Sequence, residues 1–278
     1  MLSEPLIFGH ETLSREQLLL DRGLHYGDGL FETIAVVSGC MPLLELHLLR
    51  LERDCQRLMG SYPQEDVQQR LARVQEVLVH YSQPLVVKLL ITRGVSGRGY
   101  GFSDDTPLRV FAFIYPYQPP AMTKRLSGLL VIHCSHHLSD RGMLGSIKHC
   151  NRLDQVYARA DVQRHVADEG LMYSDTGHLI EATSANVAVK LHGQWLTPEL
   201  SHVGIAGVAR QLMIDKGLLK VANISQSALS QATGMALINS VQGIMPVSVL
   251  PDIPLHEAPE SILRELSADL PHHFRGVW

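Results

Sequence analysis

Apolar residues recur with two different periods in the first half of the chain and divide it into strands and helices. Apolar runs at 30–37 and 41–44 flank Ser38-Gly39-Cys40, a pattern that predicts an antiparallel hairpin. A helical period follows from about 46 to 59, and a second helix is expected at about 65–80. The first helix has Leu48, Leu51, Cys55 and Leu58 on one face and Arg50, Arg53 and Arg57 elsewhere. Strands are expected at 85–92 and 109–115.

The second half begins after a proline-rich connection. Tyr115-Pro116-Tyr117-Gln118-Pro119-Pro120 has the composition of a domain linker. After it the pattern predicts a strand at 129–134, helices at 151–166, 208–216 and 257–270, and short strands between them. The 278 residues exceed the usual size of one domain. We expect a mixed α+β and α/β fold with a small N-terminal α+β domain (1–115), a linker (116–121) and a larger C-terminal domain (122–278).

Composition limits the kind of partner. The formal net charge is only −4 and no long run of like charges occurs, so a nucleic-acid or membrane-surface partner is not expected. The first residues have no basic segment followed by an apolar one, and no apolar stretch approaches the roughly 20 residues of a membrane helix. We therefore expect a cytoplasmic protein whose partner is a small molecule.

Cysteines and histidines suggest no metal site. The four cysteines lack C-x-x-C spacing, which favours buried, reduced thiols over a disulfide framework or a zinc site. The densest group of histidines lies at 133–137, where neighbouring residues of a strand point to opposite faces and no Asp or Glu completes a ligand set. His272 and His273 are expected in an exposed tail.

Lys148 and Glu181 form the most informative pair in the chain. Lys148 lies in Gly145-Ser146-Ile147-Lys148-His149-Cys150-Asn151-Arg152-Leu153, and Glu181 begins a segment one strand-and-turn unit later. Pyridoxal phosphate needs an amine that holds it as a Schiff base and a carboxylate that keeps its ring nitrogen protonated, because the protonated ring is the stronger electron sink. Either residue alone is more often plain surface. Together they predict a pyridoxal-phosphate site.

Two further segments suit the phosphate of that cofactor. Gly204-Ile205-Ala206-Gly207-Val208-Ala209-Arg210 leads into an apolar-periodic run, so it reads as a loop that opens a helix. Free backbone N–H groups and the helix dipole bind a phosphate dianion at such a position. Ser240 follows the apolar run 235–238 and can donate its hydroxyl to the same phosphate. Each segment alone is more often an ordinary turn.

These motifs resemble the signature set of fold-type IV pyridoxal-phosphate enzymes. The resemblance begins with Asp21-Arg22-Gly23-Leu24-His25-Tyr26-Gly27-Asp28-Gly29-Leu30-Phe31-Glu32-Thr33, continues through the Lys148, Glu181 and Gly204 segments and ends at Ser240–Pro246. It covers nearly the whole chain in the family's order. Thr92-Arg93-Gly94-Val95-Ser96-Gly97-Arg98-Gly99-Tyr100 and the segment 148–156 most resemble the aminodeoxychorismate lyase family.

The resemblance assigns roles to individual residues. It implies the following cofactor ligands: Lys148 as covalent tether and catalytic base, Glu181 at the ring nitrogen, and Arg50, the Val208 and Ala209 N–H groups and Ser240 at the phosphate. Sequence alone would favour Arg50 as a solvated helix charge. It also implies that Arg98 and Tyr100 bind the substrate carboxylates, although Arg98 is nearly as well explained as a mobile loop charge.

The resemblance also implies an activity. The lyase converts 4-amino-4-deoxychorismate into 4-aminobenzoate and pyruvate, a step of folate biosynthesis. Phe31 lines the substrate side and stands where several aminotransferases have a tyrosine, which weakens a D-amino acid or branched-chain aminotransferase as the alternative. A cofactor-holding protein without turnover is disfavoured, because a scaffold needs no electron sink. The family further implies a homodimer.

Overall fold

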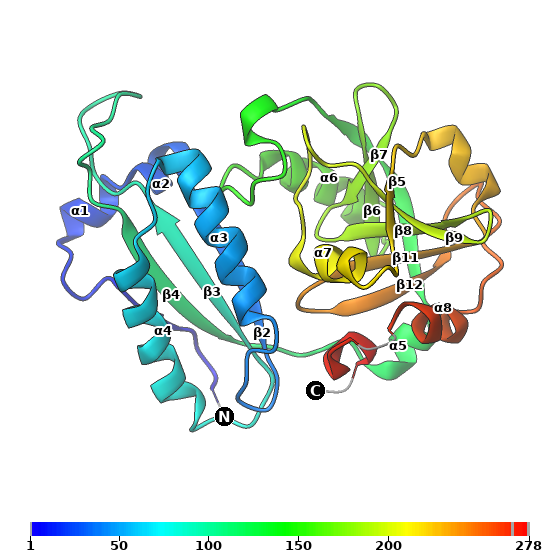
Figure 1. Ribbon diagram of the computed structural model, residues 1–278, viewed down its shortest axis with the longest axis horizontal. Coiled ribbons are helices and arrows are strands. Elements are labelled where there is room, and N and C mark those ends of the chain that lie inside the picture. Colours follow the sequence, from blue (N-terminus) through cyan, green and yellow to red (C-terminus); the bar gives the residue numbers. More distant parts are fainter. Residues whose placement is uncertain (1, 268–269, 277–278) are drawn as a thin grey trace. The chain divides into compact units, whose positions relative to one another are not determined.

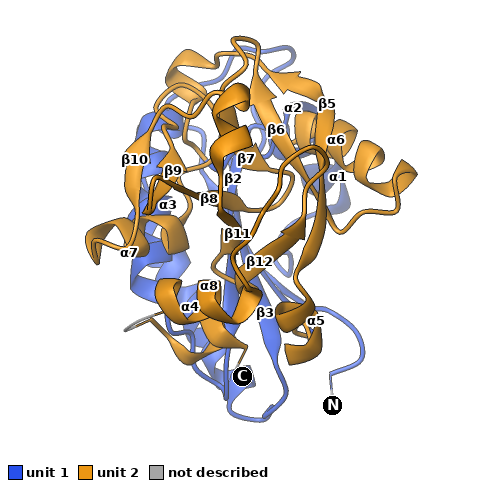
Figure 2. Ribbon diagram, turned by 90° about the vertical axis from the view of Figure 1, so that its right-hand side faces the viewer, with its two compact units in different colours: residues 1–118, 148–151 blue, residues 119–147, 152–278 orange. Residues whose placement is uncertain are grey.

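The computed structural model describes residues 2–267 and 270–276, which form two compact units (Figure 2). Unit 1 comprises the described residues up to Gln118 together with Lys148–Asn151. Unit 2 comprises Pro119–Ile147 and the described residues from Arg152 onward. The division after Gln118 lies inside the segment 116–121 assigned to a linker from the sequence. Lys148 groups with unit 1, whereas the sequence analysis assigns it to the C-terminal domain.

Unit 1 is built on a four-stranded antiparallel sheet with the strand order β1-β4-β3-β2 (Figure 1). Its elements are β1 (Leu6–Phe8), α1 (Arg15–Leu19), α2 (Arg22–Tyr26), β2 (Gly29–Val36), α3 (Leu44–Met59), α4 (Gln64–Leu78), β3 (Leu85–Thr92) and β4 (Arg109–Pro116). The two long helices and the two later strands predicted from the sequence are confirmed, with ends that differ by two residues at most.

The predicted hairpin after β2 is wrong. Val37 and Cys40 exchange two backbone hydrogen bonds, which closes a tight turn, but the residues after Cys40 do not pair with β2. The chain enters α3 at Leu44 instead, and β2 pairs with β3 along its whole length. The apolar run 41–44 therefore begins a helix, because its apolar residues continue a helical period that the short segment by itself does not reveal.

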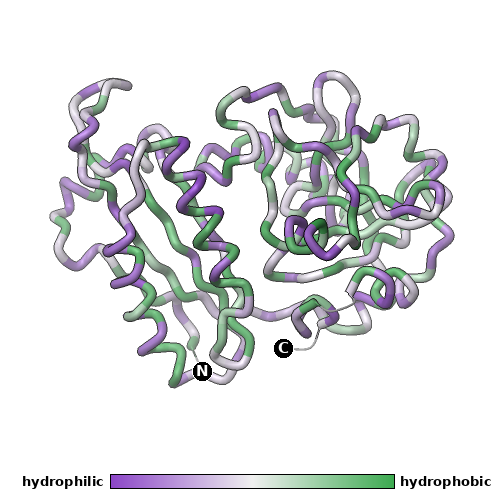
Figure 3. The backbone as a smooth tube through the Cα atoms, viewed as in Figure 1, coloured by the Kyte–Doolittle hydropathy of each residue, from purple (hydrophilic) through white to green (hydrophobic). Residues whose placement is uncertain are grey.

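Alternate residues of β2 lie on two different faces of the sheet. Leu30, Glu32 and Ile34 are fully buried on the face against which α3 packs, since Glu32 contacts side chains of α3. Phe31 is half-buried on the opposite face. Figure 3 shows hydrophobic residues concentrated on the strands of this sheet, while α3 and α4 mix hydrophilic and hydrophobic positions. The sheet thus offers one closed face and one partly open face.

Unit 2 contains an eight-stranded mixed sheet with the order β10-β9-β8-β11-β12-β5-β6-β7. The sheet curls, because the edge strand β7 also packs against β8. Its elements are α5 (Met122–Ser127), β5 (Leu129–Leu138), η1 (Gly142–Leu144), α6 (Leu153–Arg164), β6 (Glu169–Ser174), β7 (Leu179–Ala182), β8 (Asn186–Leu191), β9 (Gln194–Pro198), α7 (Val208–Asp215), β10 (Lys220–Ala222), η2 (Gln226–Gln231), β11 (Gly234–Asn239), β12 (Gly243–Val249), α8 (Pro259–Leu266) and η3 (His272–Arg275).

Two apolar clusters hold unit 2 together. One lies along the strands of the curled sheet and includes Val131, Leu171, Val187 and Leu237. The other packs α6 against β5 and β6. The helices predicted from 151, 208 and 257 are confirmed, although α8 is shorter than expected and residues 268–269 of the predicted range lie outside the described residues. None of the helices in the described part of the chain combines the length and apolarity needed to span a bilayer.

Two expectations about the surface are wrong. Cys55 and Cys134 are buried, as expected, but Cys40 is exposed at the turn after β2. His273 does not lie in an exposed tail. It is 1% exposed, and its Nε2 atom lies 3.1 Å from the Ser240 carbonyl oxygen. The sequence pattern missed this burial because two adjacent histidines have no apolar period.

Candidate active site

The segment Lys148–Asn151 pairs with the edge of the unit 1 sheet. Phe31 N donates to the Lys148 carbonyl oxygen at 3.1 Å, and Cys150 N donates to the Gly29 carbonyl oxygen at 2.9 Å. Leu30 and His149 form an antiparallel bridge between these bonds. The predicted catalytic lysine therefore sits beside a regular strand, where its backbone is fixed more firmly than it would be in an open loop.

The side chain of Lys148 lies over an aromatic ring. Its Nζ atom is 4.2 Å from the centre of the Phe31 ring, a distance at which a cation is attracted to the ring face. Asp54 of α3 accepts a long hydrogen bond of 3.4 Å from the Lys148 backbone N–H. Burial raises the pKa of Asp54, with Arg53 acting in the opposite direction. Lys148 and Phe31, both predicted from the sequence, are thus neighbours within unit 1.

Arg50 is buried instead of lying on a solvated helix face. Its Nε and Nη2 atoms donate to the two carboxylate oxygens of Glu32 at 2.7 and 2.5 Å, a bidentate fork. His47 Nδ1 lies 2.6 Å from the same carboxylate. Burial alone would raise the pKa of Glu32, but Arg50 and His47 outweigh it and lower this pKa to about 2. The sequence analysis missed Glu32 and His47, although the spacing of His47 and Arg50 at i and i+3 on a helix is a signal for a shared face.

His47 has a polar atom that the described residues leave unsatisfied. Its Nε2 atom is buried and has no hydrogen-bond partner among them. Burial, together with the positive charges of Arg50 and Lys148, lowers the pKa of His47 despite the nearby Glu32. The imidazole is therefore neutral near pH 7 and contributes no third positive charge to this cluster.

Glu181, in β7 of unit 2, accepts hydrogen bonds on both of its carboxylate oxygens. Ile205 N donates to one of its carboxylate oxygens at 2.8 Å, and Gln155 Nε2 of α6 donates to the other at 2.9 Å. Glu181 is only 3% exposed. Gly204 has a φ of +81°, and a Cβ atom there would lie 3.2 Å from a Glu181 oxygen. Glycine therefore lets the chain turn beside the carboxylate and aim the next N–H group at it.

The predicted phosphate loop opens a helix, as expected. Gly207 is the N-cap residue of α7, and no side chain caps the helix. A Cβ atom on Gly207 would lie 2.0 Å from Asn186 Oδ1, so only glycine fits there without a shift. The backbone N–H groups of Val208 and Ala209 thus lie in the first turn of a helix that has no side-chain cap, which is the arrangement that binds an anion.

The phosphate loop is tied to the residues that lead to Lys148. Ser146 forms a parallel bridge with Ile205, and Ala206 N donates to the Ser146 carbonyl oxygen at 3.1 Å. Ser146 has a φ of +65°, a strained conformation for a residue with a side chain. Unit 2 thereby connects Glu181, the start of α7 and the segment that precedes Lys148 by two residues.

Ser240 lies in the turn between β11 and β12, at the strand end predicted from the sequence. The side-chain oxygen of Asn239 accepts from the N–H groups of Val241 and Gln242 at 3.0 and 2.6 Å and so closes the turn. His273 contacts the Ser240 backbone from the C-terminal 3-10 helix. Ser240 is therefore contacted at its carbonyl group and lies in a turn that the Asn239 side chain closes.

Arg98 and Tyr100 lie on an exposed loop of unit 1. Both residues are exposed, with Tyr100 at 85%. The Tyr100 ring lies 5.4 Å from the ring of Tyr26 in α2. Each unit thus carries part of the predicted site: Lys148, Phe31, Arg50, Arg98 and Tyr100 in unit 1, and Glu181, Val208, Ala209 and Ser240 in unit 2.

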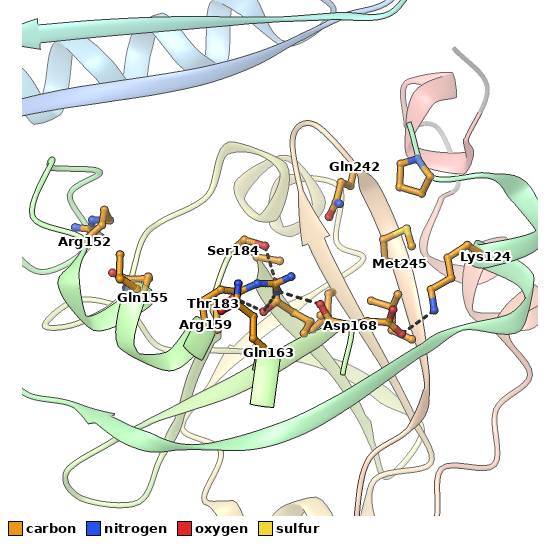
Figure 4. Close-up of a pocket in the computed structure, with 16 residues that line it drawn as sticks. Lys124, Arg152, Gln155, Arg159, Gln163, Asp168, Thr183, Ser184, Gln242 and Met245 are labelled. Atoms are coloured by element: carbon orange, nitrogen blue, oxygen red, sulfur yellow. Dashed lines mark hydrogen bonds and ion pairs between the residues drawn. The ribbon is translucent and has the colours of Figure 1, made fainter. Parts of the chain in front are cut away.

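Unit 2 also contains a cavity of about 580 Å³ (Figure 4). Gln155, which bonds Glu181, lines it together with Arg152, the N-cap residue of the same helix. Figure 4 shows Thr183 and Ser184 near its centre, where Ser184 donates to buried Glu169 at 2.5 Å. No group of three His, Cys, Asp or Glu side chains in the described part of the chain could hold a metal ion.

Comparisons with known proteins agree with this geometry. The family model for amino-transferase class IV matches residues 29–250. An aminodeoxychorismate lyase of Vibrio harveyi is 28% identical over 82% of this chain and 85% of its own length. The crystal structure of a 4-amino-4-deoxychorismate lyase from Pseudomonas aeruginosa superposes with a TM-score of 0.81 and 31% identity, over 96% of this chain and 99% of the other.

Aminotransferases are among the similar proteins as well. A D-alanine aminotransferase of Bacillus licheniformis is 22% identical over 87% of each chain. A hypothetical aminotransferase from Mycobacterium tuberculosis, solved in a form with bound pyridoxal phosphate, has a TM-score of 0.78 at 17% identity, over 95% of this chain and 98% of the other. At that identity the second likeness establishes the fold alone.

The fold and the motifs define a pyridoxal-phosphate enzyme of fold type IV. The chain belongs to the amino-transferase class IV family. Its residues fit the cofactor, because an uncapped helix start with a glycine that tolerates no Cβ suits a phosphate, and a buried carboxylate oriented by hydrogen bonds suits a protonated ring nitrogen.

The buried ion pair predicts how unit 1 responds to acid. Glu32 has a pKa of about 2 in the fold against 4.5 in the unfolded chain, so its stabilisation is complete above pH 4.5 and is lost as the pH falls through about 2. We expect Glu32→Gln to lower the free energy of unfolding at neutral pH by roughly 3 kcal/mol, since it leaves Arg50 without its counter-charge. Urea unfolding at neutral and acid pH measures both effects, and the acid dependence should flatten in the variant.

The control for this prediction is Glu76→Gln. Glu76 pairs with Arg73 on an exposed face of α4, so its loss should change the free energy of unfolding by less than about 0.5 kcal/mol. Equal effects of the two substitutions would mean that Glu32 is no more than another surface charge.

A methyl group at the start of α7 should disturb cofactor binding. Gly207→Ala places a Cβ atom against Asn186 Oδ1, so the first turn of the helix has to shift and its N–H groups no longer point at the phosphate position. We expect the dissociation constant for pyridoxal phosphate to rise about tenfold or more, measured by titration of the apoprotein. Gly97→Ala is the matched control, because nothing lies within 4 Å of a Cβ atom there. An unchanged constant in the Gly207 variant would remove α7 from the phosphate site.

Proposed function

We propose that this protein is a pyridoxal-phosphate-dependent lyase that converts 4-amino-4-deoxychorismate into 4-aminobenzoate and pyruvate. The observation that carries the proposal is the neighbourhood of Lys148, whose amine lies 4.2 Å from the ring centre of Phe31. A phenylalanine at this position offers no hydroxyl to the substrate side, so the lysine amine is left as the group that moves protons there. The likeness to named lyases at 28% and 31% identity supports the same reaction.

The proposed chemistry uses few residues. The cofactor, when bound, supplies an electron sink for the carbanion left at C4 of the substrate ring. Lys148 would act on the substrate as the general base that removes the C4 proton. Loss of the enolpyruvyl group from the adjacent carbon then makes the ring aromatic. Lys148 returns the proton to the departing group, which becomes pyruvate, so no second substrate is consumed.

The remaining residues hold these parts in place. Glu181 keeps the ring nitrogen protonated, and hydrogen bonds from Gln155 and Ile205 N orient its carboxylate. Arg50 binds the phosphate in the proposal, with its orientation set by the fork to Glu32. Val208 N, Ala209 N and Ser240 complete the phosphate ligands, while Arg98 and Tyr100 bind carboxylates of the substrate.

A D-amino acid or branched-chain aminotransferase is the second candidate. It would use the same Lys148 and Glu181, and a relative named D-alanine aminotransferase favours it. One scaffold supports both reactions, so the fold does not choose between them. The two differ in their needs, because transamination requires a keto-acid acceptor and elimination does not. A homodimer and a cytoplasmic location, expected from the sequence, remain predictions.

The covalent role of Lys148 can be separated from its charge. Lys148→Arg keeps a cation over the Phe31 ring but cannot bind the cofactor aldehyde, and Lys148→Ala removes both. We expect both variants to fold and both to lose pyruvate release and the visible absorbance of the tethered cofactor. Substantial activity in Lys148→Arg, without added amines, would contradict the assignment of Lys148 as tether and base.

The substrate class is tested by parallel assays. Wild-type protein should release pyruvate from 4-amino-4-deoxychorismate with no keto acid present, and should form keto acid from D-alanine or leucine only slowly. Arg98→Ala should raise KM for aminodeoxychorismate about tenfold, since a charge-assisted hydrogen bond contributes roughly 1.5–3 kcal/mol. Transamination faster than elimination would establish the aminotransferase instead. Unchanged kinetics in the Arg98 variant would remove only that residue from the site.

A further inference from the structure

A buried arginine of α2 bonds to the loop that carries Arg98 and Tyr100. Arg22 is only 5% exposed. Its guanidinium donates to three consecutive main-chain carbonyl oxygens of the loop and to one carboxylate: Gly99 at 3.2 Å, Tyr100 at 2.9 Å, Gly101 at 3.0 Å and Asp28 at 2.9 Å. The side chain thus follows the loop backbone over three residues.

The same residue also contacts the beginning of the loop. The backbone N–H of Arg22 donates to the Gly94 carbonyl oxygen at 2.8 Å. Among the described residues, no other hydrogen bond reaches the segment 95–101, which is rich in glycine and lies outside every helix and strand. Glycines leave a backbone free to adopt many conformations. Arg22 therefore supplies the contacts that select one conformation of this loop.

Aromatic rings extend the arrangement to the side chain of Tyr100. The Arg22 guanidinium carbon lies 5.0 Å from the ring centre of Tyr26 and 5.6 Å from that of Phe102. Tyr26 in turn packs against Tyr100 at 5.4 Å between ring centres. Arg22 thus touches the main chain of Tyr100 directly and its ring through Tyr26.

We infer that Arg22 is a positioning residue that sets the substrate-binding loop by holding the carbonyl groups of Gly99, Tyr100 and Gly101. The inference rests on the proposed function for its substrate, because only there do Arg98 and Tyr100 bind carboxylates. Arg98 precedes the three held residues directly, so the direction of its side chain depends on the backbone that Arg22 fixes. Arg22 itself touches neither substrate nor cofactor in this proposal.

The geometry requires arginine at this position. A guanidinium carries five N–H donors in a rigid planar fork, which lets it reach three carbonyl groups and Asp28 together. A lysine has three donors on a single nitrogen and cannot span the same acceptors. We therefore expect Arg22→Lys to be intermediate between wild type and Arg22→Met.

Arg93 provides a matched control. Like Arg22, it donates to Asp28 Oδ2 at 2.9 Å and lies over the Phe102 ring, at 3.9 Å. Its guanidinium also donates to the Leu58 carbonyl oxygen at 2.8 Å, which lies outside the loop. Arg93→Met therefore removes a positive charge, an ion pair to Asp28 and a contact with Phe102, as Arg22→Met does, but leaves the three carbonyl contacts and the Tyr26 contact of Arg22 intact.

Limited trypsin digestion reads out the loop without any assay of activity. Arg98 is exposed on the loop, so trypsin can cut the bond after it once the loop opens. Mass spectrometry measures the rate of cleavage after Arg98 in the holoenzyme. We expect Arg22→Met to raise this rate about tenfold or more, and Arg93→Met to leave it within about twofold of the wild-type rate. Equal rates for Arg22→Met and wild type, or equal acceleration in both variants, would overturn the inference. If Arg22→Met does not fold, Arg22→Lys decides by the same comparison.

Kinetics then connect the loop to the substrate. Arg22→Met should raise KM for 4-amino-4-deoxychorismate about tenfold while kcat and the visible absorbance of the bound cofactor change little. A faster cut after Arg98 with an unchanged KM would overturn the role of Arg22 in substrate binding. If wild type itself releases no pyruvate, the proposed lyase function fails, while the digestion rates still decide whether Arg22 holds the loop.

Discussion

Unit 1 depends on one buried carboxylate. β2 places Glu32 at 1% exposure among apolar residues, and an uncompensated charge there would prevent folding. α3 supplies the compensation through the bidentate fork of Arg50 and through His47. The helix therefore packs on the sheet through polar residues as well as through its apolar face. The position of α3 along β2 is set by the Arg50–Glu32 ion pair, whose separation would cost free energy.

That register also determines what else α3 can reach. Asp54, four residues after Arg50 and therefore on the same face, accepts from the backbone N–H of Lys148. The Lys148 segment is held from its other side by the edge of β2. A catalytic amine needs a fixed position. Two backbone hydrogen bonds to a strand fix the Lys148 segment with little strain in the backbone. The strain appears two residues earlier, at Ser146.

Unit 2 also holds a buried carboxylate in a fixed orientation. Glu181 is 3% exposed and accepts hydrogen bonds from the Gln155 side chain and from the Ile205 backbone N–H. Hydrogen bonds to a carboxylate stabilise its ionised form, which is the form that pairs with a protonated ring nitrogen. The loop that opens α7 and the helix α6 therefore both help to orient this carboxylate.

The local pattern of the sequence determined most helices and strands, the uncapped start of α7 and the position of Ser240 at a strand end, because these follow from periodicity and turn residues over short distances. Residue type was enough to select Lys148 and Glu181 as the two residues that a pyridoxal-phosphate site needs. The local pattern misjudged the residues whose state depends on distant partners. The sequence alone favoured Arg50 as a solvated charge and gave Arg22 no role. Only the tertiary structure buries them, since Arg50 bonds Glu32, 18 residues away in the chain, and Arg22 bonds carbonyl groups 77–79 residues away. Whether a charged side chain is buried depends on its partner, and the local sequence pattern does not show where that partner lies.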